Sequence, residues 1–148
     1  MKHFNRRAIL FPVEAWPLLT RIWKLQRALA QEAAPCIGEY GLNPKELMLL
    51  AFVEKRPHAG QLARELHLPA PSVTHALKRL EKAGLIVREH DPEDLRRFLF
   101  TLTPRGQEAL EAGRGCLVER LRDRLVRLAP EERATLIALL DRMLEEHA

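Results

Sequence analysis

Residues 71–88 read PSVTHALKRLEKAGLIVR, and this stretch decides the fold. Its first part predicts an α-helix from about 72 to 83, because its apolar residues recur at the spacing of one helix face. These apolar residues are Val73, Leu77 and Leu80. Gly84 is the expected end of the helix, since glycine readily adopts the left-handed conformation that commonly follows a helix. The apolar run LIV at 85–87 then predicts a β-strand.

The neighbouring segments extend this unit in both directions. On the N-terminal side the chain predicts a shorter helix at about 61–66, followed by the turn HLPAP at 67–71. On the C-terminal side, DPED at 91–94 predicts a turn and FLFTL at 98–102 predicts a returning strand. A helix, a turn, a helix and a β-hairpin in this order predict a winged helix-turn-helix unit within residues 41–102.

Long helices are expected on both sides of this unit. Residues 13–40 show apolar residues at helical spacing, and Pro17 there is compatible only with a first turn. Asn43-Pro44 and Thr103-Pro104 each combine a capping side chain with a proline at the first helical position. Pro130 begins a last helix. The flanking helices carry apolar stripes that need a partner, so we predict a mainly α-helical fold with a small β-hairpin wing.

The composition permits a nucleic-acid partner without demanding one. The 148 residues include 24 Lys and Arg against 20 Asp and Glu, a formal net charge of +4, and 47% of them are hydrophobic. The local charge is more informative, because residues 71–88 hold four cations against the single acid Glu81. The cations are Lys78, Arg79, Lys82 and Arg88.

Two features bear on the location of the protein. The apolar stretch near the N-terminus is too short for a signal peptide, and none approaches the roughly 18 apolar residues of a membrane span. The two cysteines, Cys36 and Cys116, form no CxxC pair, which excludes a zinc ribbon or a thioredoxin-type motif. We therefore expect a cytoplasmic protein with reduced thiols.

Four segments, in this order and spacing, resemble the MarR (multiple-antibiotic-resistance regulator) family: LAREL at 62–66, residues 71–88, DPEDLRR at 91–97 and LTPRG at 102–106. The resemblance covers about residues 10–146. It implies a homodimer that binds double-stranded DNA at a pseudo-palindromic operator, with its two recognition helices about 34 Å apart. Residues 41–102 would bind DNA, while residues 1–40 and 103–148 would form the dimerisation region.

The resemblance also implies a regulatory role. Such proteins usually repress transcription, and many release DNA when a small anionic aromatic ligand or an oxidant arrives; no other cofactor is expected. Two positions depart from the family pattern, and both reduce the positive charge available for DNA. Leu95 follows the wing Asp where a basic residue is common, and His75 stands where the recognition helix often has Arg. We expect specificity, or affinity at neutral pH, to differ from the family norm.

The face of the 72–83 helix opposite its apolar residues is the predicted DNA-reading surface. Hydroxyl, imidazole and cationic groups there can donate to base edges or phosphates in the major groove. The candidates are Ser72, Thr74, His75, Lys78 and Arg79. The simpler alternative is an ordinary solvated helix face, which the surrounding order of helix, turn, helix and wing disfavours.

The wing turn predicts a second contact with DNA. Asp94 and Arg96 are two residues apart, so in an extended segment their side chains point to the same side. Asp94 would orient Arg96 for insertion into a narrow minor groove, and Arg97 would point the other way, toward phosphate. The alternative is a solvated turn with a weak surface ion pair, and the family resemblance favours the DNA role.

Two further groups of residues leave alternatives open. Trp16 and Trp23 lie on one helix face, where a dimer core is the simpler interpretation. The alternative is a ligand pocket between the first helix and the DNA-binding unit, with His67 and Arg88 as polar anchors. Cys36 is a candidate redox sensor, although a buried, inert thiol is the more common role of a lone cysteine.

An enzyme is not expected. Ser72, the only serine, has His75 one turn later but no third orienting group, and it lies on a basic helix rather than at a strand-to-helix turn. The six histidines form no HExxH or comparable metal motif. The remaining alternative is a winged-helix module that binds protein instead of DNA, and the basic groups on the 72–83 helix count against it.

Overall fold

The computed structural model describes residues 12–145 and is mainly helical, with one two-stranded hairpin, as the sequence predicts. The elements in chain order are α1 (Pro12–Gly38), α2 (Pro44–Val53), α3 (Ala59–Glu65), α4 (Ala70–Lys82), β1 (Ile86–His90), β2 (Phe98–Leu102), α5 (Pro104–Leu125) and α6 (Pro130–Leu144). The strands are antiparallel, with Ile86 opposite Leu102 and His90 opposite Phe98.

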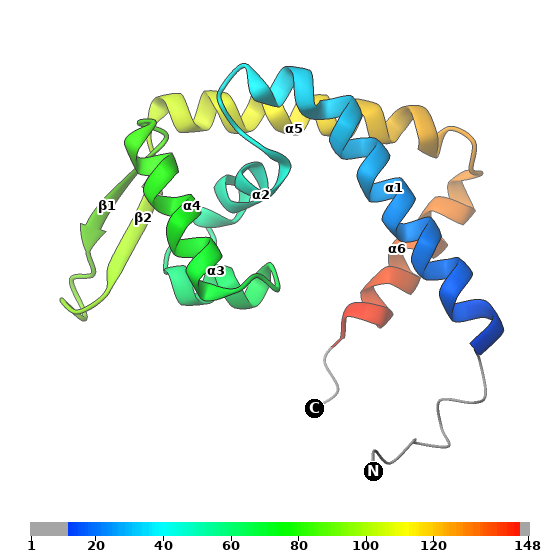
Figure 1. Ribbon diagram of the computed structural model, residues 1–148, viewed down its shortest axis with the longest axis horizontal. Coiled ribbons are helices and arrows are strands. Elements are labelled where there is room, and N and C mark those ends of the chain that lie inside the picture. The colour runs from blue at the N-terminus through cyan, green and yellow to red at the C-terminus, as the bar shows by residue number, and fades with distance from the viewer. Residues whose placement is uncertain (1–11, 146–148) are drawn as a thin grey trace, which may run out of the picture.

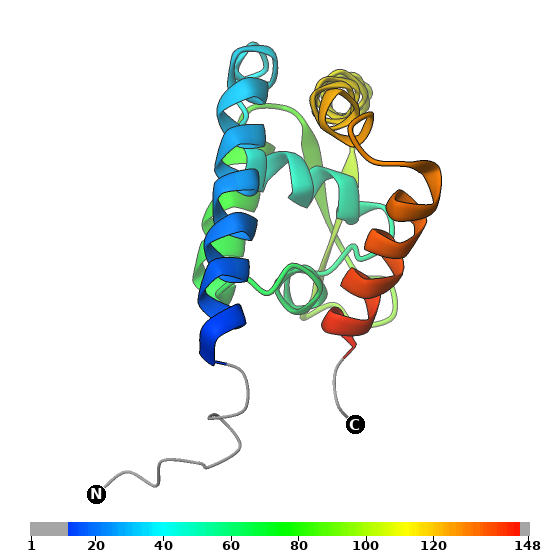
Figure 2. The same cartoon turned by 90° about the vertical axis from the view of Figure 1, so that its right-hand side faces the viewer.

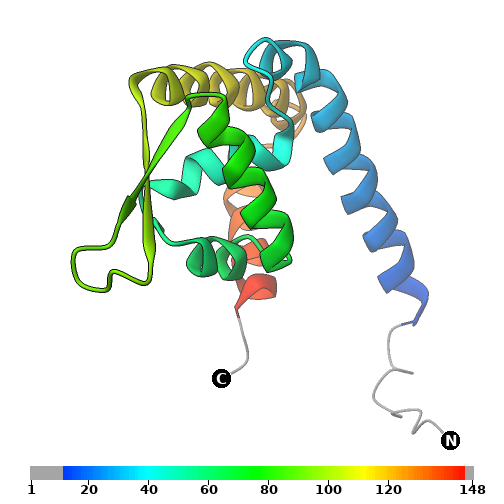
Figure 3. The same cartoon turned by 60° about the vertical axis from the view of Figure 1, so that its left-hand side comes forward.

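Helix α5 connects two groups of elements (Figure 1). The bundle of α2, α3 and α4 with the hairpin lies against one end of α5, while α1 and α6 extend from the other end on the same side of it. Helix α1 packs against α5 more extensively than any other helix does. Figure 3 shows the hairpin beside α4, on the side away from α1. The fold thus separates a compact unit from two projecting helices.

The core lies inside the compact unit and includes the inner face of α4. Apolar side chains from α2, α3, α4, β1 and α5 form one continuous buried cluster. Its members with almost no solvent exposure include Leu50, Val53, Leu62, Val73, Leu77, Leu80 and Leu110. The three residues whose spacing predicts the buried face of the 72–83 helix are all in this cluster, so that prediction is confirmed.

Two turns lock α4, the hairpin and α5 together. Gly84, which follows α4, has a φ of 75°, in the left-handed region that the predicted helix end requires. The Thr103 hydroxyl donates a 2.6 Å hydrogen bond to the Gly84 carbonyl and accepts one of 3.0 Å from the Gly106 amide. A Cβ at Gly106 would overlap the carbonyl oxygen of Leu85. Thr103 therefore caps α5 as predicted and also fixes α5 to the start of the wing.

The predicted cap of α2 is also present, and it includes a second hydrogen bond that the sequence analysis did not predict. The Asn43 side chain accepts a 2.9 Å hydrogen bond from the Glu46 amide, and the Glu46 carboxylate accepts one of 3.2 Å from the Asn43 amide. This reciprocal pair is a capping box, and Pro44 follows it at the first helical position.

Some predicted boundaries are wrong, and prolines account for most of the errors. Helix α1 begins at Pro12, so Pro17 lies beyond its first turn, at the loss of one backbone hydrogen bond. Helix α4 begins at Ala70 instead of Ser72. Pro71 is tolerated in its first turn, because the backbone amide that proline lacks would form no hydrogen bond within the helix there.

Candidate nucleic-acid interface

The outer face of α4 carries the polar residues that the sequence analysis assigns to DNA reading. Thr74, His75 and Lys78 are exposed, opposite the buried apolar face. Ser72 is only partly exposed, and its hydroxyl accepts a 3.1 Å hydrogen bond from Lys45 Nζ on α2. Three of the five predicted residues thus present donors to solvent that have no side-chain hydrogen bond to residues 12–145, while Ser72 already has a partner.

Arg79 differs from the other predicted DNA-reading residues, because its guanidinium pairs with a buried carboxylate although the side chain itself is 53% exposed. Its Nη2 lies 3.0 Å from Glu46 Oε1 and donates a 3.2 Å hydrogen bond to the Gly41 carbonyl. The Glu46 side chain is only 2% exposed and is the same group that completes the cap of α2. Arg79 therefore fixes α4 to the N-terminus of α2, a role that the sequence analysis missed.

The wing brings Asp94 and Arg96 together, as predicted, but by a different geometry. The residues lie in a turn rather than an extended segment, and Asp94 Oδ1 accepts hydrogen bonds from both the amide and Nε of Arg96, at 3.1 and 3.2 Å. The Arg96 side chain remains 91% exposed. Asp94 thus fixes the direction of Arg96 without covering it.

The turn end of the wing is held by residues to which the sequence analysis gives no role. Asp91 follows β1, and its Oδ2 lies 2.8 Å from Nε2 of His58, which precedes α3. The amide of Glu93 donates a 2.9 Å hydrogen bond to Asp91 Oδ1. This amide, together with His58, lowers the pKa of Asp91 from its ordinary value of 3.8. The Asp-Pro pair marks the turn, but no local signal identifies His58 as its partner.

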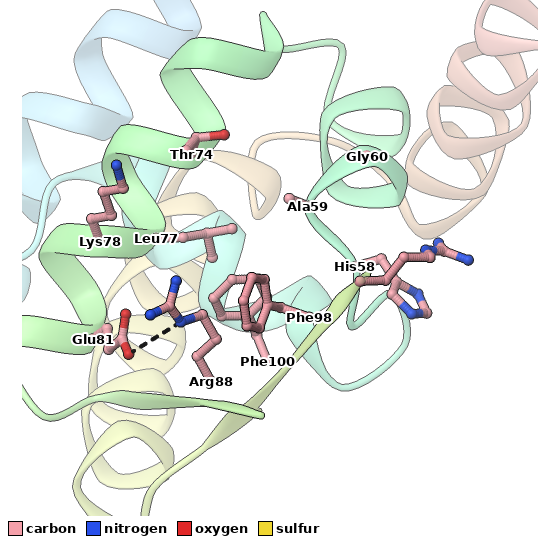
Figure 4. A pocket seen from close by; sticks show the side chains of 11 residues that line it. His58, Ala59, Gly60, Thr74, Leu77, Lys78, Glu81, Arg88, Phe98 and Phe100 are labelled. Carbon is pink, nitrogen blue, oxygen red and sulfur yellow. Dashed lines mark ion pairs between the residues drawn. The ribbon is translucent and has the colours of Figure 1, made fainter. Parts of the chain in front are cut away.

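A hollow of about 400 Å³ lies between α4 and the hairpin (Figure 4). Leu77, Phe98 and Phe100 provide apolar lining, and the Arg88 guanidinium lies 4.4 Å from the centre of the Phe98 ring. Arg88 also forms an ion pair with Glu81 at 3.7 Å. Lys78 and Arg97 supply further cationic groups to the lining, and His58 also borders the hollow. Arg97, predicted to face phosphate, thus borders this hollow.

The four residues predicted to form a ligand pocket do not come together. Trp16 and Trp23 are 69% and 61% exposed on α1, His67 lies in the turn between α3 and α4, and Arg88 lies in the hollow beside the hairpin. A separate hollow of about 400 Å³ does lie between α1 and the winged unit, where the pocket was expected. Its lining is Gln26, Arg27, Ala30, Pro44, Lys45, Met48, Leu66 and Leu68. The expected place is hollow, but the four predicted residues are wrong.

The prediction of reduced, separate thiols is also wrong, because Cys36 and Cys116 form a disulfide with their Cα atoms 6.6 Å apart. The packing of α1 against α5 brings the two residues together across 80 positions of sequence. Glu32 and Arg124 form an ion pair that joins the same two helices. Cys36 is therefore one of the two residues of a disulfide, and no spacing motif in the sequence predicts this pairing.

Within residues 12–145, no group of three or more His, Cys, Asp or Glu residues is arranged to hold a metal ion. None of the helices described is long and apolar enough to cross a membrane.

Comparison with known proteins places this geometry in a family. A profile of the MarR family matches residues 40–97. YkoM of Bacillus subtilis, a helix-turn-helix-type transcriptional regulator, is 33% identical over 139 residues, which cover 93% of this chain and 88% of that protein.

Two solved structures share the fold at 24% identity. The transcriptional regulator BldR from Sulfolobus solfataricus has a TM-score of 0.76 over 88% of this chain and 94% of its own. The transcriptional repressor CouR, bound to a 23-mer DNA duplex, has a TM-score of 0.73 over 84% of this chain and 90% of its own.

Proposed function

The chain belongs to the MarR family of transcription regulators, and on that premise we propose that it binds double-stranded DNA as a homodimer at a pseudo-palindromic operator. The family is one of regulators rather than enzymes. The observation that carries the proposal is the pairing of an exposed polar face on α4 with a wing whose Arg96 is held outward by Asp94. One helix and one hairpin are thereby available for two adjacent grooves.

Each exposed group has a specific task in this proposal. Thr74, His75 and Lys78 contact base edges and phosphates in the major groove, and Arg96 enters the minor groove, where the negative potential favours a guanidinium. Arg97 contacts phosphate beside the wing turn. Ser72 and Arg79 act differently from the prediction, because their contacts with α2 support the helix from behind.

The projecting helices support the homodimer. Large apolar side chains on α1 and α6 are more than 60% exposed in the single chain, which is unusual unless another surface covers them. They are Trp16, Trp23, Ile137, Met143 and Leu144. Figure 2 shows α1 and α6 extending in the same direction beside the compact unit. A second copy related by a twofold axis would cover both helices at once.

A small aromatic anion is the proposed effector, and the hollow between α4 and the hairpin is its proposed site. Aromatic rings supply stacking surface there, and Arg88 supplies a cation beside Phe98. Lys78 and Arg97 belong both to this hollow and to the proposed DNA surface. An anion bound to them would therefore compete with phosphate, and the protein would act as a repressor released by its effector.

Fluorescence anisotropy on the DNA upstream of the chain's own gene tests the function, with scrambled DNA as the control and two salt concentrations. We expect tight binding to the upstream DNA alone, weakening steeply with salt. Arg96→Ala should weaken this binding about tenfold while the dimer stays folded. Absence of binding to either DNA at low salt would instead favour a winged-helix module that binds protein.

A further inference from the structure

The wing of this protein is attached to the compact unit at its far end by a polar contact. On β1 only Ile86 is buried, whereas on β2 Phe100 is buried and Phe98 packs against the core, so apolar contacts hold the hairpin through β2 and leave most of β1 exposed. At the turn end of the hairpin, His58 Nε2 lies 2.8 Å from Asp91 Oδ2, and the two side chains are only 15% and 10% exposed. A polar pair with so little exposure can restrain the β1 side of the wing turn, where β1 itself has no buried apolar side chain.

Both members of the pair are themselves fixed. His58 Nδ1 lies 3.1 Å from Gln61 Oε1 on α3, so the imidazole is held on both of its nitrogens. The Asp91 carboxylate accepts the Glu93 amide at 2.9 Å. The Asp91 amide in turn donates a 2.9 Å hydrogen bond to the carbonyl of Arg97. The pair is therefore the link between a rigid helix and the two sides of the wing turn.

A continuous series of hydrogen bonds leads from this link to the exposed arginine. The Arg97 amide donates to the Asp94 carbonyl at 2.9 Å, and Asp94 Oδ1 accepts the Arg96 side chain. A rotation of the wing about its base would carry Arg96 with it. The contact between His58 and Asp91 thus lies at one end of a series of hydrogen bonds whose other end is Arg96.

We propose that His58 is a positioning residue for DNA binding, which acts through Asp91 to hold the wing at the angle where Arg96 and α4 reach adjacent grooves together. The proposal rests on the proposed function, because it requires that the wing contacts DNA. Neither residue needs to touch DNA itself. The other interpretation of the pair is that it stabilises the fold and has no particular effect on Arg96.

A double-mutant cycle on the full chain separates the two interpretations. In the wild-type background we expect Arg96→Ala to weaken binding about tenfold. In a His58→Ala background, Arg96→Ala should reduce DNA affinity less than about twofold, because a wing that is no longer held in place does not direct Arg96 into the groove. Lys78→Ala, a change on α4, should reduce DNA affinity by the same factor in the wild-type and His58→Ala backgrounds. His58→Gln, whose amide nitrogen takes the place of Nε2, should restore the full effect of Arg96.

Hydrogen exchange in the free protein provides a readout without DNA. His58→Ala should accelerate exchange at the Asp91 and Arg97 amides while the amides of α2 and α5 keep their protection. Unchanged exchange at these two amides would overturn the proposal whatever DNA binding does. Additive effects of His58→Ala and Arg96→Ala would overturn it in favour of a purely stabilising pair. If exchange accelerates but Arg96→Ala alone has no effect on affinity, the wing's role in the proposed function fails instead.

Discussion

Lys78 and Arg79 are adjacent cations with opposite surroundings. Lys78 is exposed on the outer face of α4, whereas Arg79 contacts the buried carboxylate of Glu46. The helical periodicity places both outside the apolar face, but it contains no information on Glu46, which lies 33 positions away and is buried by the tertiary fold. The sequence could therefore predict which residues of α4 avoid the core, but not which of them have a partner on α2.

We therefore expect Lys78→Ala to affect mainly DNA binding and Arg79→Ala to affect mainly stability. Lys78→Ala should weaken DNA binding and reduce the slope of log affinity against log salt by about 1, with unchanged stability. Arg79→Ala should lower the free energy of unfolding by about 1 to 2 kcal/mol, because Glu46 is left buried without its cation, although half of the guanidinium is solvated. Urea unfolding and anisotropy in parallel measure both. Equal losses in both assays would contradict this division.

Gly106 is a residue at which a single methyl group should be costly. A Cβ there would meet the backbone carbonyl of Leu85, which also accepts the Thr103 amide at 3.1 Å and is not free to move. We expect Gly106→Ala to lower the free energy of unfolding by more than about 2 kcal/mol. Gly115, on the same helix with no atom within 4 Å of its would-be Cβ, is the matched control. Gly115→Ala should be stabilising by about 0.5 kcal/mol.

Asp91 should make stability depend on pH in the acid range. Its pKa is lowered in the folded protein by the Glu93 amide and by His58, so folding favours the carboxylate. The resulting stability is present above the unfolded value near 3.8 and is lost as the pH falls through the lower folded value. In urea titrations, Asp91→Asn should be less stable than wild type at pH 6, and the difference should shrink as the pH falls below 4. A constant difference across this range would contradict the linkage.

At the scale of whole elements, the sequence predicted the order and type of the helices and strands correctly. Apolar periodicity, the caps at Asn43 and Thr103, and Gly84 are local signals, and the structure contains each of them. The predicted ligand pocket failed because it required the distances between α1, β1 and the turn after α3. Those distances depend on how the elements pack against one another. The sequence around Trp16, His67 and Arg88 contains no local signal of that packing.

Helix α6 should be required for the dimer. Its exposed apolar residues, Ile137, Met143 and Leu144 among them, have no cover in the single chain. Cutting the chain after Leu128 removes α6 and should leave a monomer in sedimentation velocity. Ile137→Asp should have the same effect in the full chain, whereas Ala138→Asp, an exposed position next to it, should leave the dimer intact. A truncated chain that sediments as a dimer would show that α6 is not part of the interface.

At the scale of the whole molecule, the disulfide makes α1 and α5 one covalently closed unit. The loop it closes spans 80 positions, which corresponds to about 4.5 kcal/mol in the chain-entropy description of a cross-link. Reduction of the wild type should therefore lower the midpoint of urea unfolding substantially. A Cys36→Ser, Cys116→Ser variant should unfold at the lower midpoint with or without reductant. An unchanged midpoint of urea unfolding for the wild type in reductant would indicate that the disulfide contributes nothing to stability.

The exposed faces of α1 and α6 also connect operator occupancy to the abundance of the protein. In the proposed dimer each face is covered only when two copies meet, so below the dissociation constant the dimer population grows as the square of the monomer concentration. Halving the rate of synthesis would then leave about one quarter of the DNA-competent dimers. The gene's own expression level thus becomes an input to the regulatory circuit, in addition to any effector.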